Sequence, residues 1–537
     1  MASRCINCGG ELKYDIPSGK VKCLHCDSSF EPETFKTETA AEEYKGEQNS
    51  TPKYDATMFV CPNCGAEIYS TELDAVNYCL YCGSFVTLES QLGRVRKPDY
   101  IIPFTKTAED CKAAYKKMIR RQIYAPGEFR DENFIQGFKG IYIPFWNFGY
   151  KYGPEIEIKG ETETREGDYL IKQKYNTKCK ASGTVDSVAY DASSNFDDEI
   201  SLRIAPYKRE DMKTFNPCYM FGFFGDTADI DREVYRKQSN DEIKEELWKA
   251  ISESKGVSDA HPTEEVPETM EKDFRMKKKI SLAMLPVWFL TWRKGDRVAY
   301  SVMNGSNGNM YAEIPVSVTR YILFSLLTAV PIFFGLNEIV TFTANEILIA
   351  AMILAMVMCL LYVFELDKIV RRVMHTDDMG FLETHEEAKK ESDEKVSKNA
   401  IMAILEALGA NSLGGWLVVI FSVIVICIGA PEYAVVGLII AVVGTPIYTL
   451  YRLYDNAKIL KEKGSSNVWL DIAGALFSVV LGAGLLIYDP APDIDYYIAA
   501  VVCMLGIGVA AVRMVSRYNQ FITRPVPRFF DRKEGAE

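Results

Sequence analysis

Eight of the fourteen cysteines fall into two copies of one spacing, and every cysteine of the second copy lies 56 residues after its counterpart. The copies are Cys5-x2-Cys8-x14-Cys23-x2-Cys26 and Cys61-x2-Cys64-x14-Cys79-x2-Cys82. A Cys-x2-Cys pair at a tight turn presents two thiolates to one ion, and two such pairs complete the tetrahedral sulfur shell that suits Zn2+. The spacing therefore predicts two structural Zn2+ ions. A thioredoxin-type redox motif or a disulfide framework is the alternative, which two matched quartets disfavour.

Each quartet predicts a zinc ribbon, a small β unit in which two knuckles are joined by a short strand pair. We expect the first ribbon at 1–30 and the second at 58–92, with an acidic and polar linker at 31–57. His25 lies inside the second knuckle of the first ribbon. Four sulfurs already fill the shell, so we expect His25 not to be a ligand.

The composition changes after residue 318, where long apolar runs begin. Six runs are long enough to cross a bilayer: about 319–337, 346–364, 413–430, 433–451, 468–488 and 496–514. Ile347 to Phe364 contains no charged residue, and Asp471 lies only where the fifth run begins. The sequence predicts an all-α bundle of six transmembrane helices at 319–514, followed by a cytoplasmic tail at 515–537.

The loops of this bundle differ in basic residues. Those joining spans one to two, three to four and five to six contain no Lys or Arg, whereas the others carry several, such as Arg371 and Lys461. Lys and Arg concentrate on the cytoplasmic side of membrane proteins. We therefore expect an integral protein of the cell membrane with both termini in the cytoplasm, where thiolate ligands also stay reduced.

Residues 93–318, between ribbons and membrane, are numerous enough for one domain with its own core. Apolar residues recur with a helical period at 106–122 and at about 209–275, where Glu242 to Ser254 is the clearest helix. Apolar and polar residues alternate, as in β-strands, from Ile141 to Tyr190 and again from Leu285 to Val316. Asn304-Gly305 predicts a hairpin turn. We predict a cytoplasmic α+β domain. The two Pro-x-Trp strands at Pro144 and Pro286 are either related halves or core strands that start alike.

Four short motifs accompany the cysteines: Ile101-Ile102-Pro103-Phe104, Ala125-Pro126-Gly127-Glu128-Phe129, Gly140 to Trp146, and Asn304 to Ser317. Together they resemble a family of bacterial proteins labelled TFIIB-type zinc-ribbon-containing, sometimes mislabelled as primosomal helicases. A Gln-Thr pair of the family's last motif is replaced here by Ser306-Asn307. The resemblance covers about residues 1–320 and implies zinc ribbons that often continue into transmembrane helices. Some members resemble envelope-stress partners of phage-shock and SPFH proteins, and the resemblance implies no catalytic residue.

Common enzyme templates lack the residues that they need. Gly19-Lys20-Val21 has no Ser or Thr to complete a phosphate-binding loop, and His385-Glu386-Glu387 has no second His. No Gly-x-Ser-x-Gly elbow occurs. The sequence therefore predicts no catalytic residues.

The function that we expect is a membrane-anchored scaffold that docks protein partners, in an envelope-stress role if the resemblance holds. We expect the contact on the second ribbon, where Leu80, Tyr81 and Phe85 would form an exposed apolar patch. A nucleic-acid-binding ribbon protein is the main alternative, which the net charge of −12 and the absence of Lys and Arg from Cys61 to Cys82 disfavour. A transporter or channel component is the second alternative.

Overall fold

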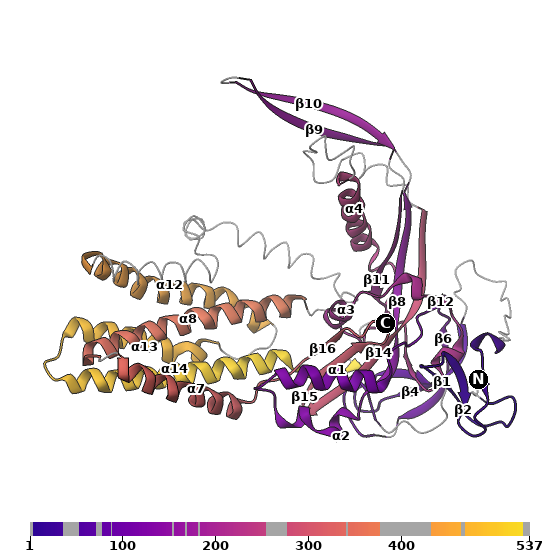
Figure 1. The fold of residues 1–537 in the computed structure, drawn as a ribbon, viewed down its shortest axis with the longest axis horizontal. Coiled ribbons are helices and arrows are strands. Elements are labelled where there is room, and N and C mark those ends of the chain that lie inside the picture. The colour runs from indigo at the N-terminus through magenta and orange to yellow at the C-terminus, as the bar shows by residue number, and fades with distance from the viewer. Residues whose placement is uncertain are drawn as a thin grey trace.

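The computed structural model describes residues 4–35, 53–70, 78–86, 88–152, 155–166, 169–180, 183–253, 277–339, 342–375, 431–462 and 468–529. These residues form a β-rich part and a bundle of long helices, which lie at opposite ends of the molecule (Figure 1). The first ribbon is at the end of the β-rich part that is remote from the helices (Figure 1). The predicted fold class is confirmed in outline, with two cysteine clusters, a sheet-rich domain and apolar helices.

The first ribbon is an antiparallel sheet of β1 (Leu12–Asp15), β2 (Lys20–Cys23) and β3 (Ser29–Phe30), followed by the 3-10 turn η1 (Pro32–Thr34). The predicted linker at 31–57 is thus structured at its start, and its residues 36–52 lie outside the described part of the chain. Tyr14 joins the ribbon to the β-rich part. Its amide donates to the carbonyl of Phe221 at 3.0 Å, and its ring meets that of Tyr219 edge-on, with 5.4 Å between centroids. The ribbon therefore docks on the β-rich part through strand β1.

A sheet of twelve strands contains the second ribbon and most of the β-rich part. Its main path runs through β12 (Lys213–Thr214), β7 (Tyr100–Ile101), β14 (Lys277–Lys294), β8 (Lys139–Tyr152), β13 (Phe224–Asp226), β5 (Glu67–Ser70), β4 (Lys53–Val60) and β6 (Glu89–Arg96). Off this path, β11 (Gly183–Asp191) pairs with β8, and β15 (Arg297–Asn304) pairs with β14, β16 (Met310–Ala312) and β17 (Arg524–Pro525).

The predicted boundary between a ribbon at 58–92 and a domain at 93–318 does not divide the structure. β6 runs across it, and β5 pairs antiparallel with β13, which places Phe224 opposite Ser70. Buried N–H and C=O groups on a strand edge need partners. The short strands of the second ribbon therefore extend the large sheet, and β13 continues it to β8.

The strands β8 and β14 pair antiparallel near the middle of the sheet. Ile143 faces Leu285, and around this pair the Pro-x-Trp motifs at Pro144 and Pro286 occupy equivalent places. Both indole N–H groups donate to loop carbonyls at 2.9 Å. The two motifs thus lie on neighbouring antiparallel strands of the core, an arrangement that fits both of the predicted alternatives.

Two predicted helices are confirmed. α1 (Ala108–Arg121) begins at a capping box of Thr107 and Asp110, and α4 (Arg236–Ser252) covers most of the helix expected at Glu242 to Ser254. The helical prediction for 209–235 is wrong, because Pro217, Gly222 and Gly225 interrupt any helical run there. That section holds η3 (Arg209–Asp211), β12, η4 (Pro217–Met220) and β13. The other short elements are η2 (Gly127–Arg130), α2 (Glu132–Ile135) and α3 (Asp198–Ile204).

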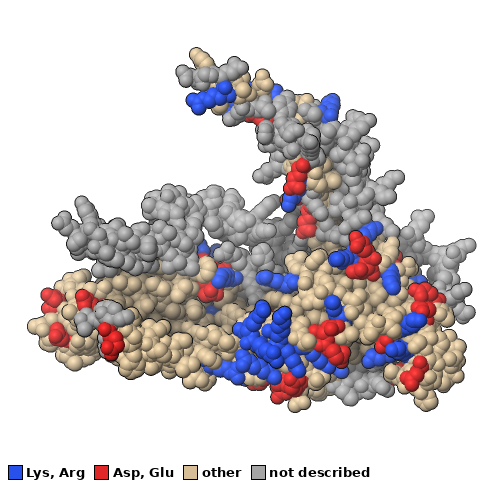
Figure 2. Space-filling view, in the orientation of Figure 1, with Lys and Arg blue, Asp and Glu red and all other residues tan. Residues whose placement is uncertain are grey.

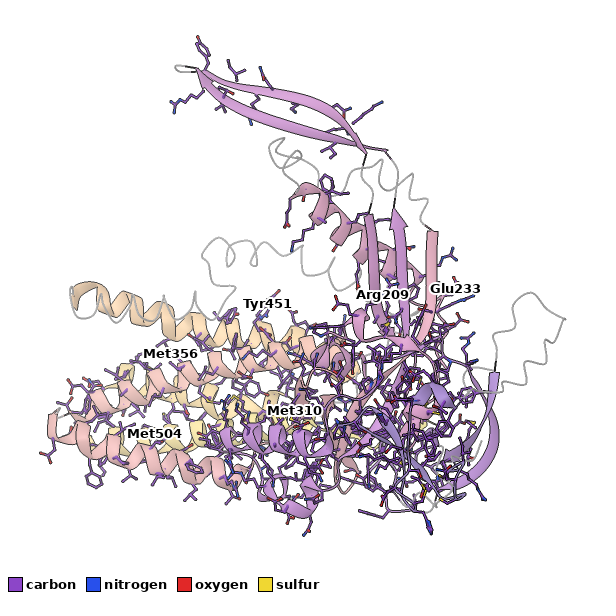
Figure 3. The ribbon with its side chains drawn as sticks, turned by 45° about the vertical axis from the view of Figure 1, so that its right-hand side comes forward. Arg209, Glu233, Met310, Met356, Tyr451 and Met504 are labelled. Atoms are coloured by element: carbon purple, nitrogen blue, oxygen red, sulfur yellow. The ribbon has the colours of Figure 1, made fainter. Side chains whose placement is uncertain are left out.

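A hairpin of β9 (Glu155–Glu166) and β10 (Tyr169–Lys180) forms a sheet of its own and projects from the β-rich part (Figures 1 and 3). Its register sets Glu161 opposite Lys174 and Glu163 opposite Lys172. Each such cross-strand pair of opposite charge stabilises a hairpin by roughly 0.2–1 kcal/mol. The strands predicted between Ile141 and Tyr190 are therefore confirmed, and β9 and β10 make up this arm.

Four described helices are long and apolar enough to cross a membrane: α7 (Val318–Ile339), α8 (Ala344–His375), α13 (Trp469–Tyr488) and α14 (Asp493–Ile522). In Figure 3, Met356 on α8 and Met504 on α14 mark this bundle. The predicted six-helix bundle is not supported. The run at 433–451 lies in α12 (Pro431–Glu462), which is not among the four, and 413–430 lies outside the described residues.

Two ion pairs join helices of the bundle. Asp471 of α13 accepts hydrogen bonds from Arg517 of α14 at 2.9 Å and from the Tyr362 hydroxyl of α8 at 3.0 Å. Asp367 of α8 pairs with Arg452 of α12. Burying a carboxylate without a positively charged partner costs free energy of folding. Each ion pair therefore holds one helix against another.

The predicted tail at 515–537 begins inside α14, which ends at Ile522, and the chain then returns to the β-rich part. Arg524 forms ion pairs with Asp197 at 2.6 Å and with Glu313, whose side chain is buried. Farther on, the amide of Phe529 donates to the carbonyl of Cys64 at 2.6 Å. The segment that follows α14 thereby reaches the second cysteine cluster.

Candidate metal centres

Both predicted cysteine quartets come together in the structure. The four sulfur atoms of each lie within 4.8 Å of one another. In the first quartet Cys8 and Cys23 are 3.5 Å apart, and in the second Cys64 and Cys79 are 3.7 Å apart. Eight thiol groups at this spacing can hold two metal ions, as the sequence predicts.

The knuckle turns of the two ribbons have the same backbone geometry. Gly9 has a φ of 73° and Gly65 a φ of 79°, in the left-handed region that favours glycine. The amide of Gly9 donates to the carbonyl of Cys5, and that of Gly65 to the carbonyl of Cys61, both at 2.8 Å. This turn directs the two sulfurs of a knuckle toward one point.

An Asn–Ser pair, which the sequence analysis missed, links the two knuckles of each ribbon. The amide of Asn7 donates to the Ser28 hydroxyl at 3.0 Å, and Asn63 donates to Ser84 at 2.9 Å. The hydroxyl of each serine also lies 3.2 Å from a cysteine sulfur, that of Cys26 or Cys82. The signal was present, because both pairs repeat at the same offset of 56 residues as the cysteines.

These hydrogen bonds favour the thiolate form that binds metals. The hydroxyl and backbone amide of Ser28 lower the pKa of Cys26 to about 6. In the first ribbon, the backbone amides of Asn7 and His25 also donate to cysteine sulfurs, each at 3.4 Å. The His25 side chain is not part of the quartet. The donor set fits a thiophilic ion of tetrahedral preference.

The second centre is enclosed by the large sheet. All four of its cysteines are buried, whereas Cys8 and Cys26 of the first centre are exposed. Strand β14 covers the knuckle at 79–82 with alternate side chains. Thr291 donates to the carbonyl of Leu80, and Arg293 donates to the carbonyl of Cys82 at 3.1 Å.

The expectation that Leu80 and Tyr81 form an exposed patch is therefore wrong. Leu80 is 1% exposed and Tyr81 is 0% exposed, and only Phe85, at 85%, lies on the surface. The Tyr81 ring packs between Phe289 of β14 and Phe529, with centroid distances of 5.7 and 5.8 Å. These covering residues are more than 200 positions away in sequence, so no local pattern could reveal them.

Behind the second centre lies a buried carboxyl group, that of Asp226. It accepts hydrogen bonds from the hydroxyls of Tyr81 and Ser193, both at 2.5 Å, and from the Asn195 amide at 3.0 Å. Burial raises the pKa of Asp226 to about 6 in spite of these donors. The network fixes the Tyr81 side chain and, through it, the knuckle.

The equivalent knuckle of the first ribbon is uncovered. Residues 24–26 are all exposed, whereas residues 80–82, their equivalents after the shift of 56, are all buried. Leu24 is 62% exposed, and Ile6 in the other knuckle is 65% exposed. Two apolar side chains thus flank the exposed metal centre.

Comparison with known proteins gives one informative relative. The chain is similar to the uncharacterized protein YdjG of Bacillus subtilis (strain 168), with 23% identity over 322 residues, which is 58% of this chain and 90% of that protein. No model of a protein family matches the chain, and no solved structure matches it.

Proposed function

We propose that the protein is a membrane-anchored scaffold whose two cysteine quartets hold structural Zn2+ and whose first ribbon binds a protein partner in the cytoplasm. Four membrane-length helices support the anchoring. The loop from Asp489 to Asp495 has no basic residue, which supports a cytoplasmic location of both termini. Four sulfur ligands and no open position favour structural zinc.

The observation that carries the docking proposal is the contrast between two equivalent knuckles of one chain. The second buries its apolar residue, Leu80, under β14, whereas the first leaves Leu24 exposed. Exposed apolar side chains grouped on a rigid support are typical of protein contacts. The first ribbon therefore exposes an apolar surface, whereas the equivalent surface of the second ribbon is covered by β14.

The second ribbon also suggests the chemistry of the partner. There the segment that follows β17 reaches the metal knuckles, where the amide of Phe529 donates to the carbonyl of Cys64 and the Phe529 ring packs on Tyr81. The carbonyl at the equivalent position of the first ribbon belongs to Cys8. We expect a partner that presents an apolar or aromatic side chain, which packs on Leu24 and Ile6.

The resemblance to TFIIB-type zinc-ribbon proteins suggests a biological role for this scaffold. Members that resemble partners of phage-shock and SPFH proteins act in envelope-stress responses, and we propose the same class of role here. The partner would then be a protein recruited to the inner face of the membrane.

Nucleic acid binding is the weaker candidate. It would rest on basic residues of the first ribbon, but Lys20 lies 2.7 Å from Glu31 and Lys22 lies 2.7 Å from Asp15. The hydrogen bond from Lys22 lowers the pKa of Asp15, which keeps this pair charged. Lysines already paired with carboxylates contribute less to phosphate binding.

The test is photo-crosslinking of the full chain in cells, with a benzophenone amino acid at position 24. We expect a discrete protein adduct, and Ile6→Ser in the same chain should lower its yield about fivefold while the metal content stays unchanged. A chain with the crosslinker at Leu202, which is also exposed, is the control. The same adduct at both positions, a nucleic-acid adduct, or no adduct at position 24 would contradict the docking proposal.

A further inference from the structure

A patch of Lys and Arg lies where the β-rich part meets the helix bundle (Figure 2). The last two turns of α1 supply Lys117, Arg120 and Arg121, which are all exposed. Arg130 is also exposed, and Arg320 belongs to the first turn of α7. We call these five residues the basic patch. The chain as a whole carries a net charge of −12, so the patch is a local reversal of sign.

The patch is fixed to the start of the first membrane-length helix. The guanidinium of Arg320 donates to the carbonyl of Ala125 at 2.8 Å, and the amide of Ser317 donates to the carbonyl of Tyr124 at 2.8 Å. The Tyr124 ring packs edge-on against Tyr321 and Phe324 of α7, with centroids 5.6 and 6.1 Å apart. The end of α1 therefore sits at the level where α7 begins.

The basic groups of the patch have no carboxylate to neutralise them in the described part of the chain. Within those residues, no Asp or Glu oxygen lies within 4.0 Å of Lys117, Arg120 or Arg121, whereas the neighbouring Lys116 pairs with Glu132 at 2.7 Å. Arg130 donates to the carbonyl of Gln122 at 2.9 Å. Arg120 and Arg121 also stabilise the carboxyl end of α1, where cations interact favourably with the helix dipole.

An apolar side chain accompanies these charges. Ile123 lies two residues after Arg121 and is 46% exposed, next to the aromatic contact of Tyr124 with α7. Basic residues beside a membrane helix attract anionic headgroups, while apolar and aromatic groups at the same level enter the interface. The charge of the patch, its position at the start of α7 and the exposed Ile123 all fit an anionic lipid headgroup.

We propose that the basic patch binds the phosphate of an anionic phospholipid in the leaflet where α7 enters the membrane. The proposal rests on the proposed membrane anchoring. Lys117, Arg120 and Arg121 contact the headgroup, Arg320 holds the site against α7, and Ile123 lies among the first methylene groups. Each basic residue near such a surface contributes to binding, and added salt weakens it.

The experiment measures lipid binding by the purified full chain in a neutral detergent, by native mass spectrometry. Phosphatidylglycerol and phosphatidylcholine with the same acyl chains are added separately. We expect the wild-type protein to bind the first phosphatidylglycerol about tenfold more tightly than phosphatidylcholine. The variant Lys117→Gln/Arg120→Gln/Arg121→Gln should lose this preference, and Arg120→Lys/Arg121→Lys should keep most of it.

The matched control is Lys13→Gln/Lys20→Gln/Lys213→Gln, which removes the same charge from β1, β2 and β12, at the end remote from the bundle (Figure 1). It should keep the tenfold preference. Equal binding of both lipids by the wild-type protein would overturn the proposal, as would a preference that survives the triple change in the patch. Loss of the preference in the presence of millimolar inorganic phosphate would assign the site to free phosphate instead.

A separate measurement distinguishes failure of this site from failure of the anchoring. If alkaline carbonate releases the full chain from membranes, the anchoring itself is wrong. If the chain stays in the membrane and shows no preference for phosphatidylglycerol, only the lipid site is wrong.

Discussion

Asp226 is a fully enclosed carboxyl group beside the second metal centre, and its titration gives a test at the residue scale. Its pKa is about 6 in the folded protein against an ordinary value of 3.8. The folded state therefore binds the proton more tightly than the unfolded state. The free energy of unfolding increases as the pH falls below 6, and this contribution is lost as the pH rises through 6. The ionised group costs about 3 kcal/mol at neutral pH.

Asp226→Asn removes this titration with little change of shape. Between pH 7.5 and pH 5, the wild-type protein should gain about 1 kcal/mol of unfolding free energy relative to the variant. Thermal unfolding of both full chains in detergent, with the metal content checked at each pH, measures the difference. Parallel pH profiles of the two proteins would show that Asp226 is not protonated in this range.

The metal ligands and their surroundings differ in how far they can be predicted from sequence. Cysteine spacing alone predicts both quartets, because the chelating geometry is local. The Asn7–Ser28 pair could also have been found from the repeat. The burial of Leu80 and Tyr81 could not, since strand β14 and the segment at Phe529, both distant in sequence, produce it.

At the scale of elements, the two ribbons share a motif but differ in how they are supported. The first is a separate three-stranded sheet with Cys8 and Cys26 exposed, whereas the second has its strands in the twelve-stranded sheet and all four of its cysteines buried. Removing one cysteine ligand should therefore change the stability of the β-rich part differently in the two ribbons. This distinction is absent from the sequence, where the two copies look alike.

Cys79→Ser should cost the β-rich part more than about 4 kcal/mol of stability, because it opens a metal centre within the core. Cys8→Ser should also release one metal ion, but it should leave the unfolding of the large sheet almost unchanged. Zinc content and thermal unfolding of both full-length variants measure this. Equal effects of the two changes, or a stable sheet in Cys79→Ser, would mean that the second ribbon is an independent unit.

Periodic elements were predicted well, and the elements set by distant pairing were not. The helix α1 and the strands between Ile141 and Tyr190 follow from their own periods. The short strand β13 has three residues and exists because β5 and β8 flank it. After α14 the chain is held to the β-rich part by the ion pairs of Arg524 with Asp197 and Glu313, which no local pattern reports.

At the scale of the whole molecule, the β-rich part and the bundle are joined at both ends of the membrane segment. The Asn519 side chain exchanges two hydrogen bonds of 2.7 Å with the backbone of Val316, just before α7. After α14, β17 pairs with β15, and Phe529 reaches the second metal centre. Composition predicts the two parts, but only the structure gives these connections. A displacement of helices in the bundle would therefore be transmitted to the sheet through these contacts.

The central claim is that membrane helices hold the ribbons on the cytoplasmic side, and side-specific labelling tests it most directly. Single cysteines are placed at Ala491, in the acidic loop between α13 and α14, and at Lys461, near the end of α12. A membrane-impermeant maleimide on intact cells should label Ala491→Cys, and it should label neither Lys461→Cys nor the unchanged protein until the membrane is permeabilised. Labelling of Lys461→Cys but not of Ala491→Cys on intact cells would contradict the account.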